Sequence, residues 1–182
     1  MVKWIIFAVV SLGIIFISWQ SLSRPRSHGF YRFFAFELLL ILLLSNLDSW
    51  IEDPYSIHQL ISWVLLSASI ILAIHGFYLL RVIGKPQGAV QGSSDFGFEN
   101  TANLVTIGAY KYIRHPLYSS LLLIGWGAFL KHTTLLSGSL VLGVSAFLIA
   151  TAKAEEKENT TRFGDEYSRY RKTTKMFIPG LI

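Results

Sequence analysis

The sequence predicts an all-α, polytopic membrane protein with about five transmembrane helices, of which the last two form a hairpin followed by a cytoplasmic helical tail. Hydrophobic residues make up 52% of the 182-residue chain and charged residues only 15%, and the mean hydropathy is +0.48, far from the soluble average. The apolar residues also gather into long runs between charged clusters. This arrangement is typical of helices that satisfy their own backbone hydrogen bonds in lipid.

The first three apolar runs predict three N-terminal spans within residues 1–81. The first covers residues 4–19, with a tryptophan at each end as at a membrane interface. The bulky residues 18–20 that follow it favour a retained helix over a cleaved signal peptide. The second and third runs cover residues 30–47 and 58–80, and a short acidic turn with Asp48, Glu52 and Asp53 separates them.

The second half of the chain predicts a loop, a hairpin and a tail within the same membrane domain. Residues 82–116 begin with a polar, glycine-rich stretch and should form a loop and pocket segment against the membrane face. The glycines from Gly84 to Gly97 would permit this loop to close over a site. Residues 117–152 read as a helical hairpin, in which the short run 117–130 leaves open whether it crosses fully. The tail, 153–182, should extend the last helix from Glu155 to Tyr170 before Pro179 ends regular structure.

The distribution of charge indicates a topology rather than a nucleic-acid partner. The net charge is +5, but the basic residues flank the apolar runs instead of forming one soluble patch. Of the 16 lysines and arginines, all but Lys3 and Lys131 fall on the side that also holds the tail. The positive-inside rule then predicts an outside N-terminus and a cytoplasmic C-terminus and active site. The chain has no cysteine, which excludes disulfides and thiolate ligands, and no metal site is predicted.

Two polar blocks adjoin the hairpin on this basic side, at residues 103–118 and 155–167. Pro116 is suited to the first position of a helix, so the side chains just before it should face the headgroups. Tyr110, His115 and Tyr118 offer aromatic faces, and Glu155 offers a carboxylate, a mixture that suits a cationic, nucleotide-like ligand. The same residue types also serve as interface anchors and solvated helix ends, and residue type alone leaves both readings open.

The order and spacing of these residues resemble the isoprenylcysteine carboxyl methyltransferase family and its bacterial relatives, which include membrane phospholipid methyltransferases. The resemblance covers about the C-terminal 80 residues. It implies a pocket for S-adenosylmethionine enclosed by the last helices and the tail, with a lateral opening for a lipidic or apolar small-molecule acceptor from the bilayer. The matching positions are Leu104-Val105-Thr106, Gly108, Tyr110, Arg114-His115-Pro116, Tyr118, Glu155-Glu156, Phe163-Gly164, Tyr167, Tyr170 and Pro179.

The resemblance carries individual roles onto this chain. Glu156 is the neighbour of the matched Glu155 and a further predicted acceptor contact. Independently of the resemblance, Arg114 or Lys153 is predicted to orient an anionic group of the acceptor. Thr151 stands where the eukaryotic prenylcysteine enzymes have an arginine that contacts substrate, so prenylcysteine is not the expected acceptor. The polar stretch 157–161 replaces a leucine-rich one and predicts looser packing of the tail. The positions expected to bind the cofactor are Ala102, Asn103, Leu104, Val105, Tyr110, His115, Pro116, Leu117, Tyr118 and Glu155.

The predicted reaction is direct methyl transfer to a carboxylate or amine, in which the protein supplies positioning and excludes water rather than a nucleophile. Two other function classes stay open: a non-catalytic membrane binding or assembly protein, and a transporter, which the one-sided placement of polar residues disfavours. Glu37 and His75 lie inside predicted spans. They either line the acceptor cavity or form hydrogen bonds between helices.

Overall fold

The computed structural model describes residues 1–88 and 96–181, and within them the chain is helical, with two isolated bridges and no strand. The all-α prediction is therefore confirmed. The middle of the glycine-rich loop, residues 89–95, lies outside the described residues, so its predicted closure does too. The helices are α1 (Val2–Leu22), α2 (His28–Ser45), a 3₁₀ turn η1 (Leu47–Trp50), α3 (Ile57–Leu79), a π-helical turn η2 (Leu80–Gly84), a 3₁₀ turn η3 (Gly108–Lys111), α4 (Pro116–Lys131) and α5 (Leu135–Thr173).

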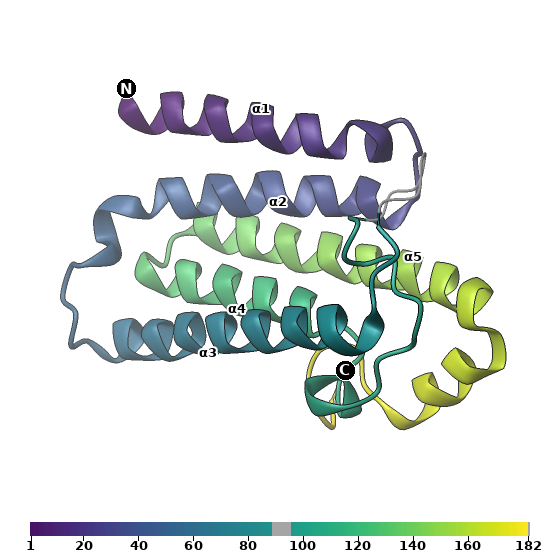
Figure 1. Ribbon diagram of the computed structural model, residues 1–182. Helices are drawn as coiled ribbons and strands as arrows, with labels where there is room; N and C mark the ends of the chain where they lie inside the picture. Colours follow the sequence, from purple (N-terminus) through teal and green to yellow (C-terminus); the bar gives the residue numbers. More distant parts are fainter. Residues whose placement is uncertain (89–95, 182) are drawn as a thin grey trace.

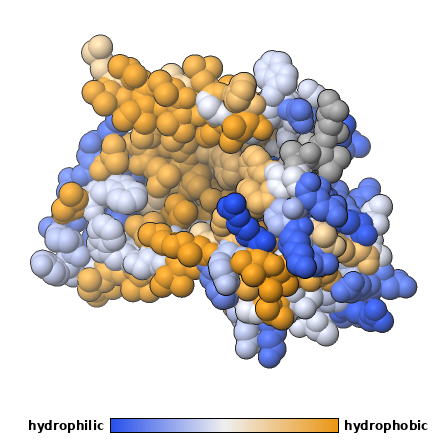
Figure 2. Space-filling view, viewed as in Figure 1, coloured by the Kyte–Doolittle hydropathy of each residue, from blue (hydrophilic) through white to orange (hydrophobic). Residues whose placement is uncertain are grey.

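The five long helices run side by side, with α3 packed on α4, α2 packed on α5, and α1 lying along the outer side of α2 (Figure 1). Apolar side chains cover the flank formed by these helices, and hydrophilic ones gather at the end where α5 and the loop after α3 project (Figure 2). α1 exposes large side chains such as Trp4, Val9 and Phe16. A helix with so much exposed apolar surface needs lipid around it.

Among the described residues, four helices are long and apolar enough to cross a membrane: α1, α2, α3 with its π-helical turn, and α5. They fit an integral membrane protein. The expected fourth span, α4, has 16 residues, which at 1.5 Å per residue is about 24 Å against a hydrocarbon core of about 30 Å. The predicted helix is thus present as α4, packed against α3 and α5, but it is shorter than either of them.

Close helix packing in this bundle depends on small and polar residues. An added Cβ on Gly127 of α4 would lie 2.9 Å from Cγ of Leu66 on α3, so only glycine allows this approach. Ser62 Oγ donates a hydrogen bond of 2.7 Å to the carbonyl of Gly127, and Asn46 Nδ2 donates one of 2.8 Å to the carbonyl of Ala128. Such contacts hold helices together in lipid, where burial of apolar surface between them contributes little.

The turn between α4 and α5 explains why these helices form a hairpin. Thr134 Oγ1 accepts a hydrogen bond from the Ser137 amide at 3.1 Å, and Ser137 Oγ accepts one from the Thr134 amide at 2.9 Å. This reciprocal pair satisfies two amides that the first turn of a helix leaves without partners. It fixes the start of α5 directly after α4 ends.

Lys3 and Lys131, predicted to lie opposite the other basic residues, are at the end of the bundle where α1 begins and α4 ends. Lys3 Nζ pairs with Asp48 at 2.5 Å. Lys131 Nζ donates a hydrogen bond of 2.8 Å to Gln59 Oε1 and sits 3.4 Å from the ring centroid of Trp63. Both ammonium groups therefore have partners within the protein.

Glu37 and His75 both contact neighbouring elements. Glu37 on α2 accepts hydrogen bonds of 2.9 and 3.0 Å from Ser11 Oγ on α1. His75 Nε2 on α3 accepts one of 3.4 Å from the Ala109 amide. Of the two interpretations left open by the sequence, the structure supports hydrogen bonding between elements for Glu37 and contact with the η3 turn for His75.

α5 continues well past its apolar part, residues 135–152, and then bends at Gly164. The backbone angles of Gly164, φ 57° and ψ −130°, are non-helical. This conformation is open almost only to glycine. After this bend the chain folds back toward the start of α4 (Figure 1). The polar stretch 157–161, expected to pack loosely, is instead attached to α2, because Glu158 accepts a short hydrogen bond from His28 Nδ1.

Candidate functional site

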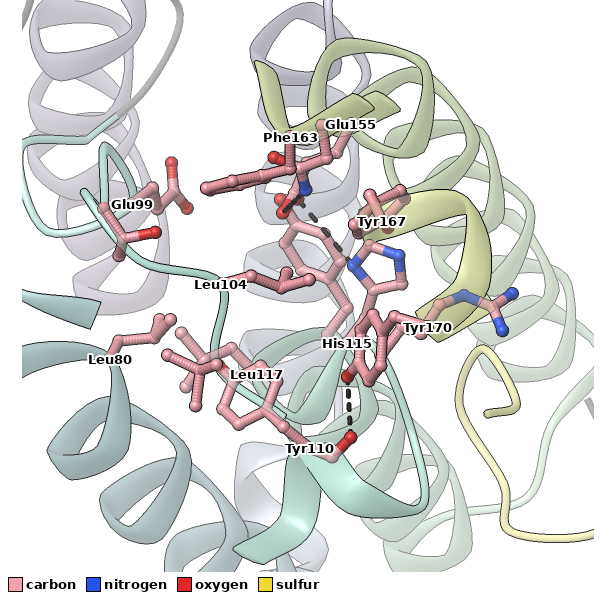
Figure 3. Close-up of a pocket in the computed structure, with 15 residues that line it drawn as sticks. Leu80, Glu99, Leu104, Tyr110, His115, Leu117, Glu155, Phe163, Tyr167 and Tyr170 are labelled. Atoms are coloured by element: carbon pink, nitrogen blue, oxygen red, sulfur yellow. Dashed lines mark hydrogen bonds and ion pairs between the residues drawn. The ribbon is translucent and has the colours of Figure 1, made fainter. Parts of the chain in front are cut away.

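The two polar blocks named from the sequence meet at one cavity, between the loop before η3, the start of α4 and the extended end of α5 (Figure 3). Its empty volume, including space open to solvent, is about 610 Å³. The residues that line it are Leu80, Glu99, Thr101, Leu104, Val105, Tyr110, Arg114, His115, Leu117, Tyr118, Glu155, Asn159, Phe163, Tyr167 and Tyr170.

The C-terminal segment holds the entrance of α4 in place. The amides of Arg114 and His115 donate hydrogen bonds to the carbonyls of Lys175 and Met176 at 2.8 and 3.2 Å, and the Lys175 amide donates to Tyr112 at 3.1 Å. Pro116 occupies the first turn of α4, as predicted. These backbone bonds fix the positions from which the side chains of Arg114 and His115 reach the cavity.

Arg114 and Glu156 form a buried ion pair beside the cavity. Arg114 Nε donates a hydrogen bond of 2.7 Å to Glu156 Oε1, and the two side chains are only 10% and 9% exposed. Arg114 Nη1 also donates to the carbonyls of Thr174 and Arg171. Burial alone would raise the pKa of Glu156, but the adjacent His115 ring and the hydrogen bond and charge of Arg114 hold that pKa below its usual value. The carboxylate therefore stays ionised.

The His115 ring lies between two carboxylates. Its Nδ1 is 3.9 Å from Glu155 Oε2 and its Nε2 is 3.5 Å from Glu156 Oε1. It stacks on Tyr118, with ring centroids 5.5 Å apart and an interplanar angle of 18°. The stack forms an aromatic wall of the cavity next to the Glu155 carboxylate (Figure 3).

Buried polar atoms without hydrogen bonds concentrate at this cavity. Within the described part of the chain, His115 Nε2, Tyr118 Oη and Tyr167 Oη have no hydrogen-bond partner, although their side chains are 5%, 6% and 2% exposed. The only other such atom there is Trp50 Nε1, at the opposite end of the bundle. His115 Nε2 faces Glu156 at 3.5 Å. Because buried polar groups nearly always have partners, the two tyrosine hydroxyls in one cavity point to a polar ligand.

The tyrosines of the cavity are neutral. Burial raises the pKa of Tyr110 well above its usual value, and the nearby charge of Glu155 adds to this. Burial and the charges of Glu156 and Glu155 likewise raise the pKa of Tyr167. Tyr170 Oη donates a hydrogen bond of 2.6 Å to the carbonyl of Tyr110. These hydroxyls are therefore donors and acceptors at neutral pH, and none is an anionic base.

Of the ten positions expected to bind the cofactor, the structure brings seven to the cavity: Leu104, Val105, Tyr110, His115, Leu117, Tyr118 and Glu155. Arg114, expected to contact the acceptor, lines it as well.

The remaining expected residues lie elsewhere. Pro116 is buried on the far side, where it packs against Gly76. Ala102 and Asn103 are exposed, and Asn103 Nδ2 bonds to the Ile83 carbonyl at 3.1 Å. Lys153 is exposed, and Glu156 lies behind the wall, bound to Arg114. Binding roles for these residues remain predictions from the sequence alone.

Sequence reasoning missed several residues of the cavity wall. Phe163, Tyr167 and Tyr170 belong to the pattern that carries the family resemblance but were not assigned to the site. Their places in that pattern were the available signal. Glu99 gave no signal, because it is a single carboxylate in a glycine-rich loop with no recognisable motif.

Fold and site together define an integral membrane protein with a small-molecule cavity at one end of its helical bundle. The chain is 27% identical to methanethiol S-methyltransferase 1 of Bradyrhizobium diazoefficiens over 88% of this chain and 57% of that protein. It is 30% identical to methanethiol S-methyltransferase of Pseudomonas deceptionensis over 40% of this chain and 27% of that protein. The chain thus covers less than two thirds of either relative. Both names agree with the resemblance to methyltransferases seen in the sequence.

No family profile matches the chain, and no solved structure matches it.

Proposed function

We propose that this protein is an integral membrane methyltransferase that uses S-adenosylmethionine and methylates a lipidic or small apolar acceptor. The observation that carries this proposal is the presence in one cavity of two buried tyrosine hydroxyls without hydrogen bonds, Tyr118 Oη and Tyr167 Oη, beside the Glu155 carboxylate. They come from both blocks of the sequence that resemble a methyltransferase family, and two methyltransferase relatives support the same reaction class.

The residues present fit this cofactor. S-adenosylmethionine supplies a methyl group on a positively charged sulfur, so its chemistry needs little covalent assistance. The aromatic rings of Tyr118, Tyr167 and Phe163 offer faces that attract a sulfonium. The Glu155 carboxylate offers an acceptor for hydroxyl or amino donors, and the unpaired tyrosine hydroxyls offer further donors.

The contribution of this chain to the reaction is positioning and exclusion of water. The C-terminal segment fixes the entrance of α4, and the part of α5 after Gly164 covers the cavity with Tyr167 and Tyr170. Holding the two reactants in line can lower the activation barrier of methyl transfer by a large part. The ring of His115 lies at the cavity with Nδ1 3.9 Å from Glu155 and Nε2 3.5 Å from Glu156, within reach of a proton released by the acceptor.

In the proposed function, the acceptor enters the protein from the membrane. An apolar groove lies between α3, α4 and the C-terminal segment, lined by side chains such as Leu72, Leu123, Trp126 and Phe177. The predicted acceptor is a lipidic carboxylate or amine. The names of the relatives favour a small thiol instead. Both are apolar enough to partition into lipid, so the fold accommodates either.

The proposed orientation sets the cavity on the cytoplasmic side. The basic residues other than Lys3 and Lys131 belong to the loops and helix ends around it, and the positive-inside rule assigns that side to the cytoplasm. S-adenosylmethionine would then enter from the cytoplasm.

Calorimetric titration of S-adenosylmethionine into the detergent-purified protein tests this function. We expect binding that is lost in His115→Ala and in Glu155→Ala and retained in Glu52→Ala, an exposed residue at the other end of the bundle. Methyl transfer from labelled cofactor should then be measured with methanethiol and, separately, with extracted lipids. Well-folded protein that binds no cofactor would refute the proposal and favour the non-catalytic binding protein.

A further inference from the structure

Glu99 lines the cavity on the side away from His115, and its carboxylate points from the loop toward the cavity (Figure 3). It lies outside the motif that carries the family resemblance. The cavity therefore has two carboxylates on different walls, Glu99 from the loop before η3 and Glu155 from α5.

Glu99 is held by residues from the N-terminal half of the chain. Arg32 Nη1 on α2 donates hydrogen bonds of 2.5 and 2.7 Å to the two oxygens of the carboxylate. The Arg32 guanidinium also stacks 3.7 Å from the ring centroid of Phe96, whose amide donates a bond of 2.9 Å to Glu99 Oε2. An arginine that binds both oxygens and stacks on a ring holds a carboxylate in one orientation.

His28, one turn before Arg32, connects this arrangement to α5. Its ring is buried, with Nε2 3.8 Å from Glu99 Oε2 and Nδ1 bonded to Glu158. Asn159, the next residue after Glu158, lines the cavity. The start of α2 thus ties together the loop wall and the α5 wall.

Glu99 is ionised in this setting. Burial would raise its pKa, but the charge of Arg32, the nearby His28 ring and the hydrogen bonds from Arg32 hold the pKa below its usual value. A charged carboxylate that lines a cavity is a strong acceptor for N–H and O–H groups of a ligand. Glu99 lines the same cavity as the unpaired hydroxyls of Tyr118 and Tyr167, from the opposite side to His115.

We propose that Glu99 is a second carboxylate that binds the cofactor, accepting a hydrogen bond from one of its N–H or O–H donors, and that Arg32 is the positioning residue that orients it. This inference rests on the proposed use of S-adenosylmethionine and adds to it a role for the N-terminal half. Glu155 and Glu99 then hold the ligand from two sides, and α2 is part of the site although it lacks the motif.

Calorimetric binding of S-adenosylmethionine to the full chain in detergent tests the role of Glu99. We expect Glu99→Gln to weaken affinity by about tenfold or more, as for a lost hydrogen bond to a charged group, while Glu52→Gln leaves affinity unchanged. If Glu99→Gln does not fold, Glu99→Asp carries the test, because it keeps the charge but withdraws the carboxylate from the cavity. A parallel titration with 5′-methylthioadenosine locates the donor: weakening of both ligands assigns it to the nucleoside, and weakening of S-adenosylmethionine alone assigns it to the amino-acid end.

The role of Arg32 is tested by combining substitutions. Arg32→Lys keeps the charge but loses the planar fork, so we expect weaker binding with a thermal midpoint close to that of the unaltered protein. Added to Glu99→Gln, it should weaken binding no further, since it acts through Glu99. Unchanged affinity in well-folded Glu99→Gln, with affinity lost in Glu155→Gln, would overturn the inference and leave the proposed function standing. No binding by the unaltered protein would overturn both.

Discussion

Removal of the Arg114 guanidinium tests how the site is held together. Arg114→Met keeps the length of the side chain but deletes the group that bonds to Glu156 Oε1 at 2.7 Å and to the carbonyls of Thr174 and Arg171. Glu156, whose side chain is 9% exposed, is then left as a buried carboxylate without its arginine. The C-terminal segment also loses its side-chain attachment to the start of α4.

The expected loss of stability follows from the burial of this pair. Breaking a buried ion pair by removing one partner costs about 3–5 kcal/mol. The lower end applies here because His115 Nε2 at 3.5 Å and Arg171 Nη1 at 4.0 Å remain near the carboxylate. A loss of about 3 kcal/mol corresponds to a fall in Tm of about 6–12 °C for a chain of this size.

The assay is thermal unfolding in detergent at a fixed scan rate, because membrane proteins commonly unfold irreversibly. Arg114→Met, Glu156→Gln and the double substitution form a cycle. We expect the double variant to be clearly more stable than the sum of the single losses predicts, since each single change leaves a buried polar group without its partner. Additive losses, or a Tm of Arg114→Met within 2 °C of the unaltered protein, would refute a structural role for this pair.

Two further predictions concern the bend in α5 and the response to acid. Gly164→Ala should lower stability by about 1–3 kcal/mol, because a side chain there is strained at φ 57°, and it should weaken cofactor binding. The control, Gly138→Ala, lies inside α5 with its nearest contact at an ordinary 3.7 Å and should change neither property. Calorimetry and thermal unfolding of both variants test this prediction. The lowered pKa of Glu156 contributes stability above the usual carboxyl pKa of 4.5 that is lost as pH falls through the folded value. The difference in Tm between the unaltered protein and Glu156→Gln should therefore be full above about pH 5 and shrink below pH 4.5, and a constant difference would contradict the assigned ion pair.

The helices could be predicted from the sequence because lipid imposes a simple rule on it. Long apolar runs have to be helical where no water satisfies the backbone, so the positions of α1, α2, α3 and α5 followed directly from composition. The extended end of α5 was also predictable as a helix. Its bend at Gly164 was not, because the residue is one of 14 glycines and only the backbone angles single it out.

The part of the cavity wall that comes from one short segment of the sequence could be predicted. The segment from Tyr110 to Tyr118 carries aromatic and basic groups in a recognisable order, and the structure brings Arg114, His115 and both of these tyrosines to the cavity. The partners of Glu99 could not be predicted, since Arg32 is 67 residues away along the chain. In the sequence Arg32 reads as one more basic residue on a membrane face, yet it is 3% exposed and paired. Tertiary pairing of this kind leaves no local pattern.

The ion pair between Arg32 and Glu99 links the N-terminal helix α2 to the cavity wall. A carboxylate as buried as Glu99 would lose its charge without a cation nearby, and the cation comes from α2 rather than from the motif-bearing half. Arg32 likewise needs Glu99, because an unpaired guanidinium at that depth is strongly unfavourable. The two halves of the chain therefore stabilise each other at the cavity wall. A fragment that contained only the motif would retain Glu155 and His115 but lack the residue that keeps the opposite wall charged.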